Sequence, residues 1–272
     1  MIIDSHVHVW VQQPEKYPWL PVGGYIPNTE APVEKLLEIM ALNGVDRAVL
    51  VQPTPYGWNN RYLMDAAKIA PDKFRTICLV DPMSPQNVNE MKRLVELDGV
   101  SGFRLNWNLQ PVDVWEETPA HLSFWKTASE LNRPICIQCT LEYIPLLRSM
   151  CQRFPQVHVV VDHLGRLNTA GGITNFNFQQ LLSLSQEPNT FIKISGLYYC
   201  SRQSPPYTDL MPFLQTVLDS YGAERCLWGS DFPFIQEHWD YTSMLEFIKQ
   251  TVSRSEDDIQ WLLGKTAWNL WW

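Results

Sequence analysis

The stretch IDSHVHVW, residues 3–10, places two histidines one position apart in a run that otherwise has the pattern of a buried strand. Side chains alternate between the two faces of a strand, so His6 and His8 point to the same side. Burying a polar imidazole costs free energy unless a partner compensates for it. Neutral imidazole is also a common metal ligand. With Asp4 nearby, the pair predicts a functional site on the first strand rather than two histidines of the core.

Seven further apolar runs of strand length follow this first one along the chain. The eight predicted strands cover residues 1–7, 46–52, 74–80, 100–106, 134–139, 157–163, 191–197 and 226–231. Several of them are continuously apolar, which is typical of strands whose two faces are both covered by helices.

Amphipathic segments alternate with the strands. The predicted helical segments cover residues 32–44, 59–73, 84–97, 118–132, 141–154, 176–187, 207–222 and 241–252. The first has Val33, Leu36, Leu37 and Met40 on one face, with Pro32 at its start and Gly44 at its end. This strict alternation predicts the α/β class and a (β/α)8 TIM barrel, with residues 1–272 forming a single domain.

The composition narrows the range of partners. The 272 residues carry a formal net charge of −8, whereas nucleic-acid partners require a basic surface. No apolar run is long enough to span a membrane, and the N-terminus lacks the basic start of a signal peptide. Six cysteines without the spacing of a small disulfide-rich domain fit a reduced, cytoplasmic protein. We therefore expect a small-molecule substrate, with no nucleic acid and no membrane as partner.

Polar side chains gather at the ends of the predicted strands, which is where TIM barrels carry their active sites. The residues at these ends are His6, His8, Arg104, Asn106, Gln138, Asp162, His163, Ser230 and Asp231. The long loops 9–31 and 107–118 follow strands one and four, and loops of that length are often functional. Trp10 and Trp19 in the first loop are candidates for stacking on a substrate ring. Arg166 and Tyr198, which follow strands six and seven, are further candidates for substrate binding.

Three of these residues have more than one interpretation. Arg104 places a permanent cation in the barrel mouth, so it requires an anion, either a structural carboxylate or a substrate carboxylate. Asp231 could bind a metal ion, take a proton from water, or cap a helix. His163 alone is equally consistent with a hydrogen bond in the core and with chemistry.

The motifs IDSHVHVW, GFRLN, VDHLGR, IKISGLY and LWGSDFP, in this order, resemble the amidohydrolase superfamily and, within it, the amidohydrolase 2 branch. The segment LLGKTAWNLW, residues 262–271, resembles the closing helix of that branch. The resemblance is strongest to its lactonase group, which includes fuconolactonases, 4-sulfomuconolactonases and 2-pyrone-4,6-dicarboxylate lactonases. It implies a (β/α)8 barrel that hydrolyses a lactone of a sugar acid or a dicarboxylic acid.

The resemblance also implies roles for individual residues. His6, His8, His163 and Asp231 match the catalytic positions of the family, with Asp231 as the residue that activates the hydrolytic water. Arg104 matches a strand-four arginine placed to bind a substrate carboxylate or hydroxyl. We expect Asn106 and Gln138 to contribute to specificity.

The metal content remains open at this point. Two-metal relatives and decarboxylase relatives carry a histidine on strand five, where this chain offers Gln138. One divalent ion, zinc or manganese, held by His6, His8 and Asp231 is one alternative. The other is a metal-independent mechanism, in which hydrogen bonds from histidines and arginine activate the lactone carbonyl.

Two other functions compete with a lactonase. A metal-dependent, non-oxidative decarboxylase of a small aromatic or muconate-type acid belongs to the same branch, and the missing strand-five histidine argues against it. A barrel that only binds a ligand or a protein would have little need for all four candidate catalytic residues. The closing Trp271 and Trp272 could be an apolar end plug or a subunit contact, so a homodimer is one arrangement that the sequence leaves open.

Overall fold

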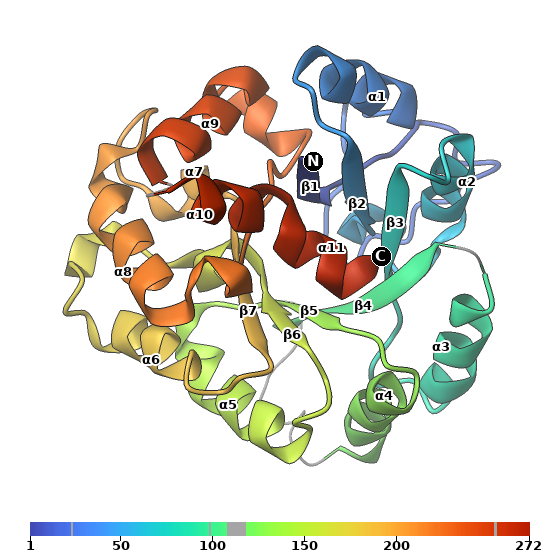
Figure 1. Ribbon diagram of the computed structural model, residues 1–272. Helices are drawn as coiled ribbons and strands as arrows, with labels where there is room; N and C mark the ends of the chain where they lie inside the picture. Colours follow the sequence, from blue (N-terminus) through green and yellow to red (C-terminus); the bar gives the residue numbers. More distant parts are fainter. Residues whose placement is uncertain (23, 98, 108–117, 253–254) are drawn as a thin grey trace.

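The computed structural model describes residues 1–22, 24–97, 99–107, 118–252 and 255–272. Eight parallel strands follow one another in the order β1 to β8 (Figure 1). They are β1 (Ile3–Val7), β2 (Arg47–Val51), β3 (Phe74–Leu79), β4 (Val100–Asn106), β5 (Ile135–Gln138), β6 (Val159–Val161), β7 (Thr190–Ile194) and β8 (Cys226–Trp228). The predicted (β/α)8 barrel is confirmed. Most of the predicted functional loop at 107–118 lies outside the described residues.

Helices surround the strands, and Figure 1 shows α11 lying across one end of the barrel. They are α1 (Val33–Leu42), α2 (Arg61–Ile69), α3 (Asn87–Val95), α4 (Pro119–Glu130), α5 (Ile144–Arg153), α6 (Phe176–Leu184), α7 (Leu197–Cys200), α8 (Met211–Tyr221), α9 (Tyr241–Phe247), α10 (Glu256–Gln260) and α11 (Thr266–Trp271). Helix α1 buries Val33, Leu36 and Met40, as its periodicity predicted, whereas Leu37 is only half-buried. None of the described helices is long and apolar enough to cross a membrane.

The seam between β1 and the chain after β8 closes the barrel and aligns two parts of the candidate site. The backbone N–H of Asp231 donates to the carbonyl of His6 over 2.9 Å, and that of His8 donates to the carbonyl of Phe232 over 2.7 Å. At Gly229 a Cβ atom would lie 2.7 Å from the Cβ of His6, so only glycine allows this approach. Residues near the two ends of the chain are thereby fixed side by side.

Seven of the eight strands are shorter than the sequence predicted, and the early ends of β6 and β8 place two candidate site residues. Strand β6 ends at Val161 instead of residue 163, because Asp162–Arg166 (η5) forms a tight turn in which His163 has a φ of 52°. Strand β8 ends at Trp228 instead of residue 231, and Asp231 has a φ of 60°. Left-handed backbone of this kind cannot continue a strand ladder. His163 and Asp231 therefore lie on turns just beyond the strands, where their side chains can reach the barrel mouth.

Trp271 closes the amino-terminal end of the barrel. Its side chain is buried and packs with the apolar cluster inside the strands, which comprises Ile3, Val49, Val51, Ile77, Cys136, Val160, Leu227 and Ala267. The end-plug interpretation is thus confirmed for Trp271. Trp272 is half-buried and stacks on Trp268.

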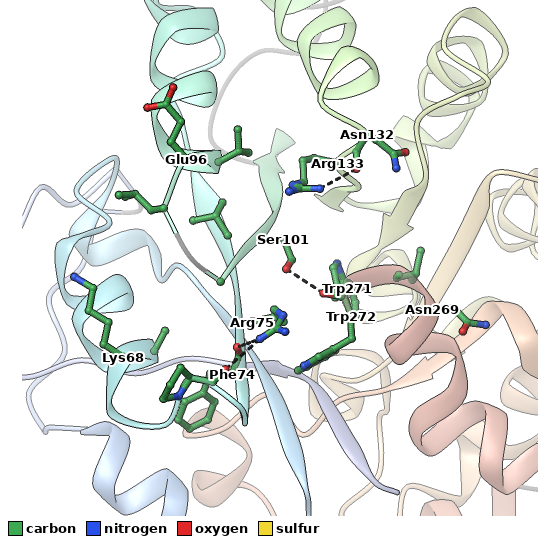
Figure 2. Close-up of a pocket in the computed structure, with 17 residues that line it drawn as sticks. Lys68, Phe74, Arg75, Glu96, Ser101, Asn132, Arg133, Asn269, Trp271 and Trp272 are labelled. Atoms are coloured by element: carbon green, nitrogen blue, oxygen red, sulfur yellow. Dashed lines mark hydrogen bonds between the residues drawn. The ribbon is translucent and has the colours of Figure 1, made fainter.

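A groove of about 980 Å³ lies beside this plug, with Arg75, Ser101, Arg133, Trp271 and Trp272 among its walls (Figure 2). The described residues that line it include no histidine, cysteine or aspartate. The chemistry predicted from the sequence therefore belongs to the opposite end of the barrel.

Candidate active site

A pocket of about 390 Å³ opens at the carboxyl ends of the strands, a size suited to a small molecule. Its described lining consists of His8, Tyr25, Pro53, Thr54, Arg104, Asn106, Gln138, His163, Arg166, Tyr199, Asp231 and Phe234. The structure thus brings seven of the predicted site residues to one pocket. His6 is fully buried and touches this group from beneath.

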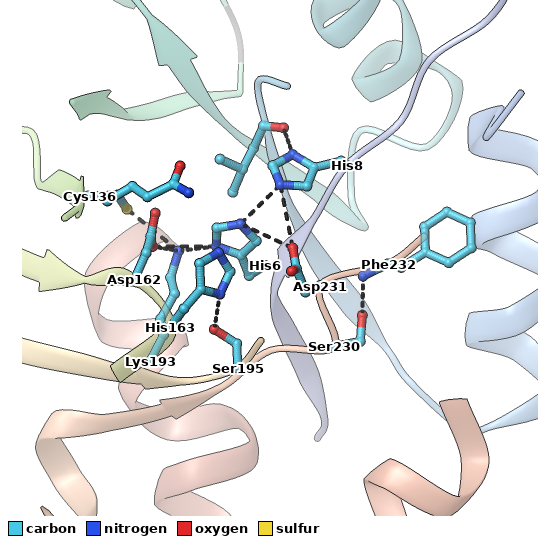
Figure 3. Close-up of polar contacts among 12 residues, drawn as sticks. His6, His8, Cys136, Asp162, His163, Lys193, Ser195, Ser230, Asp231 and Phe232 are labelled. Carbon is cyan, nitrogen blue, oxygen red and sulfur yellow. Dashed lines mark hydrogen bonds and ion pairs between the residues drawn. The ribbon is translucent and has the colours of Figure 1, made fainter. Parts of the chain in front are cut away.

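The two histidines of β1 and its end meet through their ring nitrogens. Nε2 of His6 lies 3.1 Å from Nε2 of His8, and Nδ1 of His8 lies 2.7 Å from the carbonyl oxygen of Val51 (Figure 3). A carbonyl only accepts hydrogen bonds, so Nδ1 of His8 carries the proton. Burial, reinforced by the charge of Arg104, lowers the pKa of His8 to about 3. His8 is therefore neutral, with a bare Nε2 at the pocket.

Asp231 presents one oxygen to the histidines and uses the other to hold its position. The Tyr198 hydroxyl donates to Oδ2 over 2.6 Å. Oδ1 lies 3.5 Å from Nε2 of His8 and 3.7 Å from Nε2 of His6, and it is buried without a hydrogen-bond partner among the described residues. Burial raises the pKa of Asp231 to about 7. An unpartnered buried carboxylate oxygen at a pocket is placed to bind water or a cation.

His163 reaches the same centre from the turn after β6. Its Nδ1 lies 2.9 Å from Oγ of Ser195, and its ring centroid lies 4.5 Å from that of His6. Burial lowers its pKa well below the usual value. Gly196 makes room for the ring, because a Cβ there would lie 2.7 Å from Nδ1 of His163. Nε2 is the ring nitrogen left for a substrate or a metal ion.

A buried ionic cluster beneath the pocket was not assigned a role from the sequence. Lys193 on β7 is fully buried, and its Nζ lies 3.0 Å from Oδ1 of Asp162 and 3.0 Å from Nδ1 of His6. Burial alone would raise the pKa of Asp162, but Lys193 and Arg104 outweigh it and hold that pKa well below the usual range. The signal was present in FIKISGL, residues 191–197, where one lysine interrupts an apolar strand.

Arg104 pairs with a structural carboxylate, which is one of the two kinds of anion that the sequence left open. Its Nε donates to Oδ2 of Asp162 over 2.8 Å, and both side chains are buried. The residue also lines the pocket, so the pairing with Asp162 positions a cation in the pocket wall. Binding of a substrate group by Arg104 remains a prediction.

The predicted substrate-binding residues divide into two groups. Asn106 donates to Oε1 of Gln138 over 3.0 Å, and both line the pocket together with Arg166. Arg166 stacks its guanidinium 4.4 Å from the ring centroid of Tyr199 and has no carboxylate partner within the described ranges. Its charge therefore has an aromatic platform and an open side at the pocket.

Trp10 and Trp19 are not brought to the described pocket lining. The indole N–H of Trp10 donates to the carbonyl of Thr29 over 2.6 Å, which fastens the loop after β1. Trp19 stacks on Tyr56 with ring centroids 4.3 Å apart. Tyr198 likewise lies outside the lining, and its hydroxyl is committed to Asp231. The first two contacts hold the loop after β1, and the third holds Asp231, which lines the pocket.

The donor set fits one divalent metal ion. Nε2 of His6, Nε2 of His8 and Oδ1 of Asp231 are separated by 3.1, 3.5 and 3.7 Å. Ligand atoms around a tetrahedral zinc ion lie roughly 3.3–3.5 Å apart, since each bond is about 2.0–2.2 Å long. His163 offers an alternative third ligand beside His6 and Asp231. The unpartnered Oδ1 of Asp231 is consistent with such a site.

Comparison with known proteins assigns the chain to a family. The family model described as Amidohydrolase matches residues 3–271. The 4-sulfomuconolactone hydrolase of Hydrogenophaga intermedia is 27% identical over 85% of this chain and 74% of its own length. The L-fucono-1,5-lactonase of Burkholderia ambifaria is 26% identical over 93% of this chain and 88% of its own.

A solved structure supports the same family assignment. The crystal structure of a Pseudomonas putida protein, provisionally named a 2-pyrone-4,6-dicarboxylic acid hydrolase, is 28% identical. It superposes with a TM-score of 0.87 and covers 99% of this chain and 97% of its own. The chain belongs to the amidohydrolase family, as its ordered motifs indicated.

Proposed function

We propose that the protein is a hydrolase that opens the ring of a lactone, with Asp231 activating the attacking water. The observation that carries this proposal is Oδ1 of Asp231, buried, unpartnered among the described residues and facing two neutral histidines at the pocket. The lactone hydrolases among its relatives support the same reaction class.

The reaction follows from the groups around the pocket. Water bound at Oδ1 of Asp231 gives up a proton to that oxygen, and the hydroxide adds to the lactone carbonyl. With the Ser195 hydroxyl as donor to Nδ1, His163 carries its proton on Nε2. This N–H and the guanidinium of Arg104 lie at the pocket, where they can stabilise the developing oxyanion. When the ring C–O bond breaks, Asp231 returns the proton to the departing oxygen. Tyr198 fixes the carboxylate through Oδ2, and the His6–His8 pair lies beside Oδ1.

A divalent ion such as zinc or manganese, if bound, would be held by His6, His8 and Asp231 and would supply a Lewis acid that polarises the carbonyl. The steps assigned above to His163, Arg104 and Asp231 use side chains of this chain only.

The pocket favours an acidic or hydroxylated lactone. Arg166 carries a charge that no described carboxylate neutralises, so it is placed to bind an anionic substituent. The amides of Asn106 and Gln138 provide donors and acceptors for ring substituents. A carboxylated lactone or a sugar-acid lactone meets both conditions.

Proton release on a panel of carboxylated and sugar-acid lactones tests the proposal, with each assay run with and without a chelator. The matched variant is Asp231→Asn, because Asn tolerates the left-handed backbone at this position. We expect turnover of at least one lactone by the wild type and a loss of about 10³-fold or more in the variant, with an unchanged melting temperature. Absence of turnover on every lactone, with consumption of a small aromatic acid instead, would favour the decarboxylase alternative.

A further inference from the structure

Lys193 makes polar contacts on one side of His6 that a simple packing role does not require. Its Nζ lies 3.0 Å from Nδ1 of His6, 3.0 Å from Oδ1 of Asp162 and 3.6 Å from Sγ of Cys136 (Figure 3). The side chain is fully buried between the strands, with the ring of Trp271 5.5 Å from Nζ. A lysine ammonium has three donors and no acceptor, and the carboxylate of Asp162 pairs its charge.

With no metal ion bound, the contacts of the two histidines favour one arrangement of their ring protons. The carbonyl of Val51 requires the proton of His8 to be on Nδ1, which leaves its Nε2 bare. Two bare nitrogens cannot hydrogen-bond across the 3.1 Å gap, so Nε2 of His6 carries the proton and donates to His8. A neutral imidazole has one N–H, hence Nδ1 of His6 is bare and accepts from Lys193. A chain of hydrogen bonds therefore runs from the ammonium of Lys193 through His6 and His8 to the carbonyl of Val51.

Metal binding needs the opposite tautomer of His6. If Nε2 gives its lone pair to a cation, the proton moves to Nδ1, where the N–H faces the ammonium of Lys193. Both groups are donors, so they cannot form a hydrogen bond with each other. The nearest acceptor for that proton is Oδ1 of Asp162, at the longer distance of 3.4 Å. The charge of the ammonium, which contacts the opposite ring nitrogen, also disfavours a cation at Nε2.

We propose that Lys193 is a positioning residue that holds His6 in its Nε2–H tautomer and thereby weakens divalent-metal binding at the His6–His8 pair. Lys193 thus sets whether the two histidines act as a hydrogen-bonded unit or as a pair of metal ligands. The inference concerns the protonation pattern and the affinity for a metal, and it does not depend on which substrate the pocket accepts.

Nitrogen NMR of the imidazole rings tests the tautomer directly. In histidine-labelled protein, with His6 assigned through a His6→Asn variant, we expect Nδ1 of His6 to resonate as an unprotonated nitrogen and Nε2 as a protonated one. In Lys193→Met, Asp162 becomes the neighbour of Nδ1 and the pattern should invert. Lys193→Arg keeps an N–H donor and should retain the wild-type pattern. Lys265→Met, at an exposed lysine paired with Asp257, is the control for loss of one charge.

Calorimetric titration with zinc chloride alone provides the second readout. We expect Lys193→Met to bind zinc about tenfold or more tightly than the wild type, as changes of partners behind metal ligands typically alter affinity by about 10–100-fold. A wild-type spectrum with the proton of His6 on Nδ1 would overturn the proposal, even if the Met variant fails to fold. A folded Met variant with unchanged tautomer and unchanged zinc affinity would also overturn it.

Discussion

The hydroxyl of Tyr198 donates a 2.6 Å hydrogen bond to Oδ2 of Asp231, which leaves Oδ1 as the oxygen that faces His6 and His8. One oxygen of this carboxylate is therefore held by Tyr198, and the other is the oxygen that the proposed reaction uses. Tyr198 reaches it from the short helix after β7, while Asp231 lies on the turn after β8.

Tyr198→Phe tests this division of labour. We expect kcat to fall about 10–100-fold, because a hydrogen bond to a charged group contributes about 1.5–3 kcal/mol and its loss lets the carboxylate rotate. KM should change much less, since Tyr198 is absent from the described pocket lining. Steady-state kinetics on the best lactone measures both constants. Tyr143→Phe, far from Asp231 along the chain and outside this pocket, is the control, and an unchanged kcat in Tyr198→Phe would remove Tyr198 from the site.

Arg166→Met tests recognition of an anionic substituent. The guanidinium stacks 4.4 Å from the ring centroid of Tyr199, and no described carboxylate competes for it. We expect KM for a carboxylated lactone to rise about 10–100-fold, because charge-assisted hydrogen bonds are among the stronger polar contacts. KM for an uncharged lactone should stay within about twofold. The exposed Arg202→Met serves as the matched control, and an equal loss on both substrates would contradict a charge-specific role.

Trp271→Ala tests the plug at the amino-terminal end of the barrel. The indole is 4% exposed and packs on the apolar cluster inside the strands, so its removal leaves a cavity there. We expect the free energy of unfolding to fall by about 3–5 kcal/mol, as for other buried tryptophans. Trp268→Ala on the same helix removes a side chain that is 37% exposed and should cost clearly less. Urea unfolding of the two variants provides the comparison, and equal losses would argue against the plug.

Asp209 connects the loop after α7 to Thr169 through hydrogen bonds, and its carboxylate makes a pH-dependent contribution to the stability of the fold. Burial opposes its ionisation, but hydrogen bonds from Ser201, Thr169 and the backbone N–H of Arg202 outweigh this and lower its pKa. A lowered folded-state pKa stabilises the protein above the ordinary Asp value of about 3.9, and this stabilisation is lost as the pH falls through the folded-state value.

We therefore expect Asp209→Asn to reduce the unfolding free energy at neutral pH and to have a progressively smaller effect as the pH falls below the ordinary Asp value of about 3.9. Denaturant unfolding across this range is the measurement. A difference between wild type and variant that grows as the pH falls would have the wrong sign for this explanation.

The local sequence determined the architecture of this protein and most of the candidate site residues that the fold brings together. Continuous apolar runs, alternating with amphipathic segments, specify parallel strands covered by helices, so the barrel followed from periodicity alone. Because all parallel strands of a barrel end on the same side, the polar residues at those ends had to converge. His8, His163, Arg104 and Asp231 meet at one pocket for this reason.

The tertiary structure decided which atoms face one another. Trp10 and Trp19 were expected at the substrate. Instead, the indole of Trp10 is hydrogen-bonded to Thr29 within the same loop and Trp19 stacks on Tyr56, so both lie outside the described pocket lining. Lys193 was overlooked, although one charge in an apolar strand was visible in the sequence. The burial of such a charge depends on Asp162 and His6, which are 31 and 187 positions away along the chain. Strand periodicity gives the direction in which a side chain points. The partners of that side chain depend on the register of the strands across the barrel and on the left-handed turns after β6 and β8. Both of these are defined only in the folded chain.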